Sequence, residues 1–114
     1  MNDIDDFAKW TKSNWFALEE KFDNVTPLVE HDLQVMCLGL PEEVGEVLAV
    51  LKRRIRDDKF DEDKMKKELG DVIHYWSMIC NYFGYAPSEI IDMNILKIND
   101  RRQRGVLRGT GDDR

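Results

Sequence analysis

Apolar side chains recur at helical spacing along most of the chain, and this pattern predicts four helices. The first is expected over residues 5–22, the second from about 30 to 56, the third over 61–83 and the fourth from Ser88 to the tail. No stretch alternates apolar and polar residues between turn residues, as a half-buried strand would. The sequence therefore predicts an all-α fold.

Residues that favour helix ends lie where the periodic pattern starts and stops. Asp5 or Asp6 is expected to cap the first helix, and Asp61 the third. Gly84 stands where a left-handed residue would end the third helix. Pro41 lies inside the second segment, and a proline there should either kink the helix or restart it.

Length and composition fit one small globular domain, residues 1–114. Hydrophobic residues make up 42% of the chain and charged residues 35%, a mixture that predicts solvated helices around a core. There is no apolar run near 18 residues, and the N-terminal residues are acidic rather than basic. We expect a cytoplasmic protein without membrane contact. Cys37 and Cys80 lie in apolar stretches without metal-site spacing, which favours buried, reduced thiols.

Charge is distributed unevenly along the chain. The net charge of −6 argues against a non-specific nucleic-acid-binding protein, which needs a basic surface. Residues 94–114 nevertheless carry +3, so the rest carries −9. Residues 104–114 contain three glycines and should be flexible unless a ligand or a neighbouring subunit orders them. This basic tail is either solvated or a phosphate-binding segment that serves a metal site.

Two pairs of acids have helical spacing. Glu43 and Glu46 are three residues apart, as are Glu68 and Asp71, so each pair projects from one face of its helix. Such pairs usually belong to a solvated surface. Around the third helix, however, Glu68 and Asp71 fall inside the apolar stripe, which contains Val72, Tyr75, Ile79 and Tyr82. Acids on a buried face require a counter-charge, and an all-carboxylate set favours Mg²⁺, with Mn²⁺ as a substitute.

The other faces of these two helices give weaker indications. The core stripe of the second helix is expected to consist of Val44, Val47, Leu48, Leu51 and Ile55. The glutamates lie beside that stripe and could be flank or site, although the apolar Ala49 and Val50 one turn later favour a site. The arc of the third helix expected to meet water carries Lys66, Lys67, Gly70, His74, Ser77 and Asn81.

At this point the motifs resemble a known family. The segments LGLPEEVGEV (38–47) and KELGDV (67–72) resemble the paired acidic motifs of the MazG-type branch of the all-α nucleoside triphosphate pyrophosphohydrolases. Asn94, Lys97 and Arg101, which share a helix face, resemble its downstream substrate-binding motif. The resemblance spans roughly residues 33–104. It implies a four-helix bundle completed by dimerisation, as a homodimer or homotetramer.

The same resemblance implies a reaction and assigns roles. The reaction is Mg²⁺-dependent hydrolysis of a nucleoside triphosphate to a monophosphate and pyrophosphate. Metal ligation falls on Glu43, Glu46, Glu68 and Asp71, and phosphate contact on Lys97 and Arg101. Glu42 is a candidate general base or second-metal ligand, although its helix phase differs from that of Glu43 by about 100°.

Further candidates for substrate contact come from the helices and the tail. Arg53 could reach a phosphate or be a surface residue, and Arg104 and Arg108 would suit a closing flap. The tryptophans, Trp10, Trp15 and Trp76, could stack on a base, but aromatic residues at helical spacing more often pack in a core or interface. The first helix is where base contacts are expected. His74 is expected on the surface.

Two other functions fit the same sequence. One is a sibling activity on the same scaffold, hydrolysis of dUTP or phosphoribosyl-ATP, which would share the acidic pairs and differ in base recognition. The other is a non-catalytic helical dimerisation or regulatory module, with the metal as a structural element. The complete set of carboxylates favours an enzyme over this module.

Overall fold

The structure is a computed structural model that describes residues 3–15 and 28–114. For residues 28–30 it describes the backbone only. It contains four helices and, within these residues, no strand. They are α1 (Ile4–Asn14), α2 (Leu28–Asp57), α3 (Glu62–Phe83) and α4 (Pro87–Gln103). The predicted all-α fold is confirmed.

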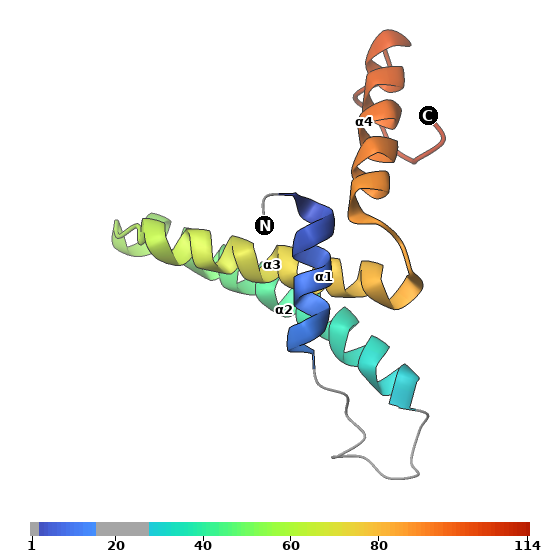
Figure 1. Ribbon diagram of the computed structural model, residues 1–114. Coiled ribbons are helices and arrows are strands. Elements are labelled where there is room, and N and C mark those ends of the chain that lie inside the picture. The colour runs from blue at the N-terminus through green and yellow to red at the C-terminus, as the bar shows by residue number, and fades with distance from the viewer. Residues whose placement is uncertain (1–2, 16–27) are drawn as a thin grey trace.

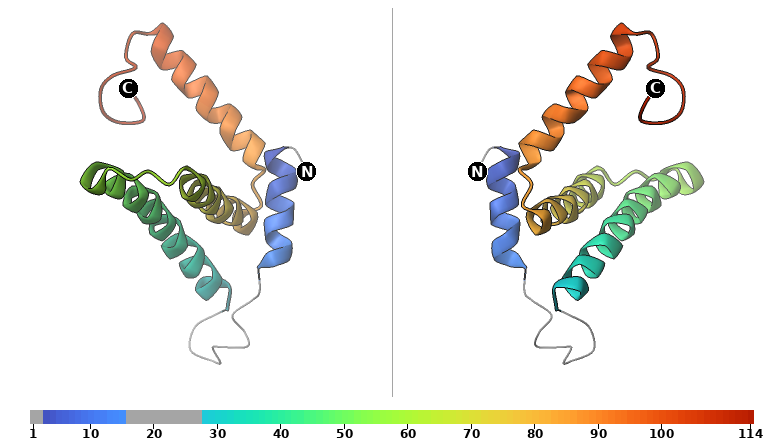
Figure 2. Two further views of the ribbon diagram at one scale, coloured as in Figure 1. Left: turned by 90° about the vertical axis from the view of Figure 1, so that its left-hand side faces the viewer. Right: turned by 90° about the vertical axis from the view of Figure 1, so that its right-hand side faces the viewer.

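The body of the molecule is the antiparallel pair of α2 and α3, which make the most extensive contact between elements (Figure 1). Helix α1 lies across α3, and α4 projects away from the pair, with its main contacts to α1 (Figures 1 and 2). None of the described helices is long and apolar enough to span a membrane. Among the described residues, one face of α2 and most of one face of α4 are exposed.

Helix α3 has the ends that its sequence predicts. The side chain of Asp61 accepts a hydrogen bond from the backbone N–H of Lys64 at 3.0 Å, as an N-cap should. Gly84 has φ 73° and its N–H donates to the carbonyl of Asn81 at 3.1 Å. Only glycine adopts this left-handed conformation at little cost, so the helix stops there.

Helix α1 differs from its prediction at both ends. Its N-cap is Asp3, whose side chain accepts from the N–H of Asp6 at 2.8 Å, so Asp5 and Asp6 belong to the first turn. The helix ends at Asn14 because Trp15 is extended, with φ −84° and ψ 129°. The predicted continuation to residue 22 is wrong at Trp15, and its further contacts, Leu18 and Phe22, lie outside the described residues.

Helix α2 runs through Pro41 without ending. Of the two alternatives predicted for Pro41, a kink or a restart, the restart is therefore wrong. Proline removes one backbone hydrogen bond and costs about 3 kcal/mol in a helix interior. The packing of α2 along α3 outweighs that loss.

Helix α4 begins one residue earlier than predicted. Pro87 occupies its first turn and Ala86 is an N-cap without a side-chain hydrogen bond. Ser88, the expected first residue, instead donates from its backbone N–H at 2.9 Å and from its hydroxyl to the carboxylate of Asp5. These hydrogen bonds stabilise the ionised form, so the pKa of Asp5 lies below its usual value. They also tie α4 to α1.

The predicted water-facing arc of α3 is wrong for its C-terminal half, because α1 covers it. Ser77 is fully buried there. The amide of Asn81 donates to the carbonyl of Ala8 at 2.8 Å and lies 3.2 Å from the hydroxyl of Thr11. Ala8 and Thr11 are themselves buried, so small residues allow the two helices to approach closely. Asn81 is therefore a hydrogen-bonding partner of α1, whereas the hydroxyl of Ser77 is buried without a partner among the described residues.

His74, expected on the surface, is half-buried under the same helix. Its ring lies edge-on to Phe7 and to Trp10, with centroids 6.4 and 6.1 Å away. Both cysteines are free, but only Cys80 is buried, and the expectation that Cys37 is buried is wrong.

The apolar stripe predicted as the core of α2 is mostly exposed. Leu48 is 59% and Ile55 78% exposed, and Val44 and Leu51 share this surface. Val50, two turns beyond Glu43 on the acid-bearing face, is almost completely buried at 2% exposure. The acid-bearing face of α2 thus packs against α3, and the stripe of Val44, Leu48, Leu51 and Ile55, called here the α2 stripe, points away.

Candidate metal centre

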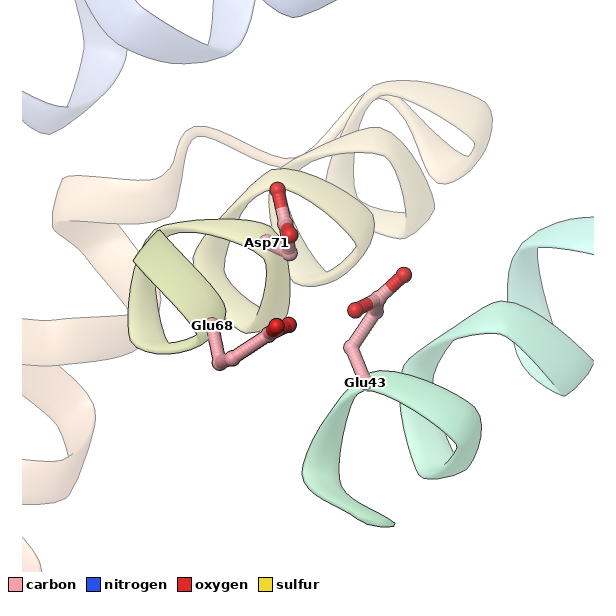
Figure 3. Close-up of side chains that lie close together, drawn as sticks. All are labelled: Glu43, Glu68 and Asp71. Carbon is pink, nitrogen blue, oxygen red and sulfur yellow. The ribbon is translucent and has the colours of Figure 1, made fainter. Parts of the chain in front are cut away.

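Three of the four predicted metal ligands converge between α2 and α3. Glu43 projects from α2 towards Glu68 and Asp71 on α3 (Figure 3). One oxygen from each carboxylate lies within 4.8 Å of the others. Glu43 and Glu68 are half-buried and Asp71 is exposed, so the group opens to solvent on one side. This arrangement, called here the carboxylate cluster, can be reached by a phosphate and by water.

The negative charges of the carboxylate cluster would be stabilised by a bound cation. The pKa of Glu43 is raised, first by burial and then by the charges of Asp71 and Glu68. Within residues 3–15 and 28–114, no lysine or arginine forms an ion pair with any of the three. Carboxylates crowded in this way repel one another unless a cation is shared between them. Oxygen donors of this kind, with room left for water and phosphate, suit Mg²⁺.

The two remaining predicted acids lie at the rim of the carboxylate cluster. Glu46 is one turn further along α2 and exposed, and Glu42 is exposed beside Glu43. Neither contributes an oxygen to the compact group. Both are near enough for their charges to raise the pKa of Glu43.

A contact that the sequence analysis missed sets the spacing of the two helices beside this cluster. Gly39 is buried under the ring of Tyr75, and a Cβ atom built on Gly39 would lie 2.2 Å from Cε1 of Tyr75. Glu43 comes one turn after Gly39, and Asp71 one turn before Tyr75 on the antiparallel partner. The close approach at Gly39 therefore brings the two carboxylates within reach of one cation.

The negative charge of the carboxylate cluster also affects the pKa of Tyr75. Its pKa is raised, first by burial and then by Glu43 and the neighbouring acids. The signal for the contact was present in the sequence, as a glycine in the apolar part of a helix, where it is costly unless another residue needs the space.

Replacing Gly39 by alanine is expected to destabilise the fold by about 1–3 kcal/mol, because the new methyl group displaces the ring of Tyr75 and separates α2 from α3. The measurement is the urea midpoint at constant m. Gly70→Ala is the matched control, since a Cβ there meets nothing within 4 Å. That variant should gain up to about 1 kcal/mol from helix propensity. Equal stabilisation by both substitutions would contradict the packing role of Gly39.

The predicted substrate-binding residues lie elsewhere in the chain. Asn94, Lys97 and Arg101 are on α4, which points away from the carboxylate cluster (Figure 2). The structure does not bring them to the acids within one chain. Arg101 is buried and Arg104 pairs with Asp100 on the same helix at 2.8 Å.

The remaining predicted bases are exposed. Arg53 lies on α2, about two turns beyond Glu46, and Arg108 lies in the tail. Neither is held against the carboxylate cluster by a hydrogen bond or ion pair in the part of the chain that the structure describes.

Comparison with known proteins agrees with the motifs and with the all-α architecture. The MazG nucleotide pyrophosphohydrolase domain matches residues 31–106, which include the carboxylate cluster and nearly all of α2, α3 and α4. The Gene 37 protein of Mycobacterium phage L5 is 32% identical over 87 residues, which cover 72% of this chain and 76% of the phage protein. No solved structure matches the chain. Since the matched segment makes up most of the chain, the protein belongs to the MazG nucleotide pyrophosphohydrolase domain family.

Proposed function

We propose that this protein hydrolyses a nucleoside triphosphate to the monophosphate and pyrophosphate with the help of Mg²⁺. The observation that carries the proposal is the carboxylate cluster of Glu43, Glu68 and Asp71, which has no cationic partner within the described chain. It lies in a domain of the MazG nucleotide pyrophosphohydrolase family. Crowded carboxylates raise one another's cost of ionisation, so a module without a bound metal would gain nothing from them.

The residues divide between holding the metal and managing the proton. Glu43, Glu68 and Asp71 would bind Mg²⁺, with Glu46 completing the set from the rim. When bound, the ion would offset charge on the phosphate oxygens and lower the pKa of nearby water. Glu42, exposed beside Glu43, would accept the proton of the water that attacks the anhydride between the α and β phosphates. Manganese would substitute for Mg²⁺ with the same ligands.

The phosphate-binding residues of α4 would bind the phosphates of a substrate held at the carboxylate cluster of a second copy. Lys97 and Arg101 do not face the acids of their own chain, because α4 projects outward. The radius of gyration is 17.6 Å, whereas a compact chain of this length has about 13 Å. The α2 stripe is exposed, and α4 also exposes Ile91, Met93, Ile95 and Leu96. Both surfaces would be covered in a homodimer, and two such dimers would form a tetramer.

The base would bind in a cavity of about 130 Å³ that lies about two turns along α2 and α3 from the carboxylate cluster. The cavity is lined by Lys12, Trp15, Asp32, Met36, Met78 and Tyr82, with Asn81 beside them. Met36 precedes Glu43, and Met78 follows Asp71, by seven residues, about 10 Å along each helix. Nε1 of Trp15 and Oδ1 of Asp32 are buried without a hydrogen-bond partner among the described residues. A base with both a donor and an acceptor could satisfy these two atoms after a small side-chain rotation.

The test is pyrophosphate release from a panel of canonical and modified ribo- and deoxyribonucleoside triphosphates, including dUTP, with phosphoribosyl-ATP as a further substrate. Each is measured with Mg²⁺, with Mn²⁺ and with a chelator. We expect metal-dependent release of pyrophosphate from at least one triphosphate. Preference for dUTP or for phosphoribosyl-ATP would identify the sibling activity. The absence of release from every substrate with either metal would favour the regulatory module.

A further inference from the structure

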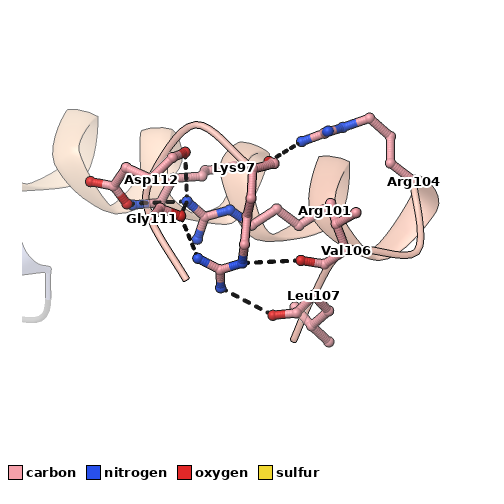
Figure 4. A network of polar contacts seen from close by, with 8 residues as sticks. Lys97, Arg101, Arg104, Val106, Leu107, Gly111 and Asp112 are labelled. Carbon is pink, nitrogen blue, oxygen red and sulfur yellow. Dashed lines mark hydrogen bonds and ion pairs between the residues drawn. The ribbon is translucent and has the colours of Figure 1, made fainter. Parts of the chain in front are cut away.

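The tail of the chain folds back over α4 and contacts the side chains of Lys97 and Arg101, which the proposed function assigns to phosphate binding. After Arg104 the chain turns at Gly105, Gly109 and Gly111, which all have positive φ, so these turns depend on glycine. Asp112 then lies against α4, where its Oδ1 is 3.2 Å from Nζ of Lys97 and 3.1 Å from Nη2 of Arg101 (Figure 4). One carboxylate oxygen thus serves both bases.

Backbone groups of the tail complete the contact with Arg101. Nη2 of Arg101 also donates to the carbonyl of Asp112 at 2.7 Å and lies 3.4 Å from that of Gly111. Arg114, the last residue, donates to the carbonyls of Val106 and Leu107, both at 3.1 Å, and closes the tail into a loop. The pKa of Asp112 is lowered, first by its hydrogen bond from Arg101 and then by that from Lys97. The tail therefore presents an ionised carboxylate to the pair.

The fit between this carboxylate and Arg101 is incomplete. Arg101 is only 4% exposed, yet its Nε–H has no acceptor in the described chain. The contacts to the tail are made by one nitrogen, Nη2. A guanidinium presents its N–H groups as a planar fork, which pairs best with two oxygens of one anion. A phosphate could engage both Nε and Nη2 and still leave an oxygen for Lys97, whereas Asp112 does not.

From this mismatch we infer that the carboxylate of Asp112 occupies the position that a phosphate group of the substrate takes when it binds. The tail, residues 105–114, is a strap that occupies the Lys97–Arg101 site when no substrate is bound. The pyrophosphate portion of the substrate displaces Asp112 from these cations. This inference rests on the proposed role of Lys97 and Arg101, and it adds that the protein binds its substrate against competition from its own tail.

Competition of this kind lowers the apparent affinity by the fraction of molecules in which the site is open. The side chain of Asp112 is 81% exposed, so solvent screens its ion pairs and the strap is held weakly. Removing its charge should therefore strengthen phosphate binding by about two- to fivefold.

The experiment measures binding of inorganic pyrophosphate to the full chain by calorimetry in the presence of a chelator, so that metal ligation plays no part. Asp112→Asn should bind about two- to fivefold more tightly than the wild type. Asp113→Asn is the matched control, because it removes the same charge one residue away, where no hydrogen bond or ion pair is formed in the described chain. Its affinity should equal that of the wild type. Lys97→Ala should weaken binding in both the wild-type and the Asp112→Asn chain.

The outcomes separate the strap from the proposed function. If Asp112→Asn has no more effect than Asp113→Asn, or if Lys97→Ala leaves binding unchanged, the strap is refuted even when the wild type hydrolyses triphosphates. If Asp112→Asn alone tightens binding while no triphosphate is hydrolysed, the strap stands and the proposed reaction fails.

Discussion

Replacing Glu68 by glutamine or Asp71 by asparagine is expected to slow pyrophosphate release by at least about 100-fold. Each change removes one of three carboxylates whose oxygens lie within 4.8 Å of one another. A bound metal contributes several kcal/mol to the stabilisation of charge in the transition state, and about 1.4 kcal/mol corresponds to a factor of ten in rate. The measurement is kcat and kcat/KM for the best triphosphate over a range of Mg²⁺ concentrations.

Thermal unfolding distinguishes lost metal binding from lost folding. Because the carboxylates repel one another, each variant should be at least as stable as the wild type without metal. Mg²⁺ should raise the Tm of the wild type and have little effect on the variants, since a ligand stabilises only the state that binds it. Glu62→Gln, an exposed acid in the first turn of α3, is the control and should keep the wild-type rate. Variants that bind no metal but retain full activity would refute the role of the carboxylate cluster.

Introducing a charge into the α2 stripe is expected to separate the proposed dimer. Leu48 is 59% exposed in one chain and occupies the middle of this stripe. Burial of a leucine contributes about 1.5–3 kcal/mol, and a symmetric interface contains the residue twice. Leu48→Glu should therefore weaken self-association by at least about 100-fold. Sedimentation or light scattering across a range of protein concentrations would measure the change.

The same variant tests whether α4 acts on the partner's acids. If Lys97 and Arg101 complete the site of the second copy, activity should fall with the dimer fraction as the protein is diluted. Lys66→Glu, on the outward arc of α3, places an acid where no interface is proposed and should leave both properties unchanged. A wild-type chain that is monomeric and fully active would contradict the dimer.

Both ends of α3 were predicted correctly from the sequence. Asp61 and Gly84 define the ends of α3 because an N-cap and a left-handed C-cap need only their immediate neighbours. Helical periodicity placed Glu68 and Asp71 on one side of α3, and both project towards Glu43 on the neighbouring helix. Their predicted burial is right only in part, because Glu68 is half-buried and Asp71 is exposed.

The errors concern features that depend on residues far apart in the chain. Leucines and glutamates lie on adjacent faces of α2, and composition favoured the leucines as the core. The structure instead packs the acid-bearing face with Val50 against α3. Ser77 and Asn81 look solvated in sequence but are covered by α1, more than 60 residues earlier. The contact between Asp112 and Arg101 was missed for another reason: the two residues are only 11 positions apart, but no periodic pattern connects a tail with a helix.

The contact between Gly39 and Tyr75 limits how the sequence can diverge. Because a single methyl group at position 39 would already lie 2.2 Å from the ring at position 75, neither position can change freely while the other is kept. A relative with a larger residue at 39 should carry a smaller one at 75, so the two positions should covary across the family. Substitution patterns at these positions would then record the distance between the two helices that carry the acids.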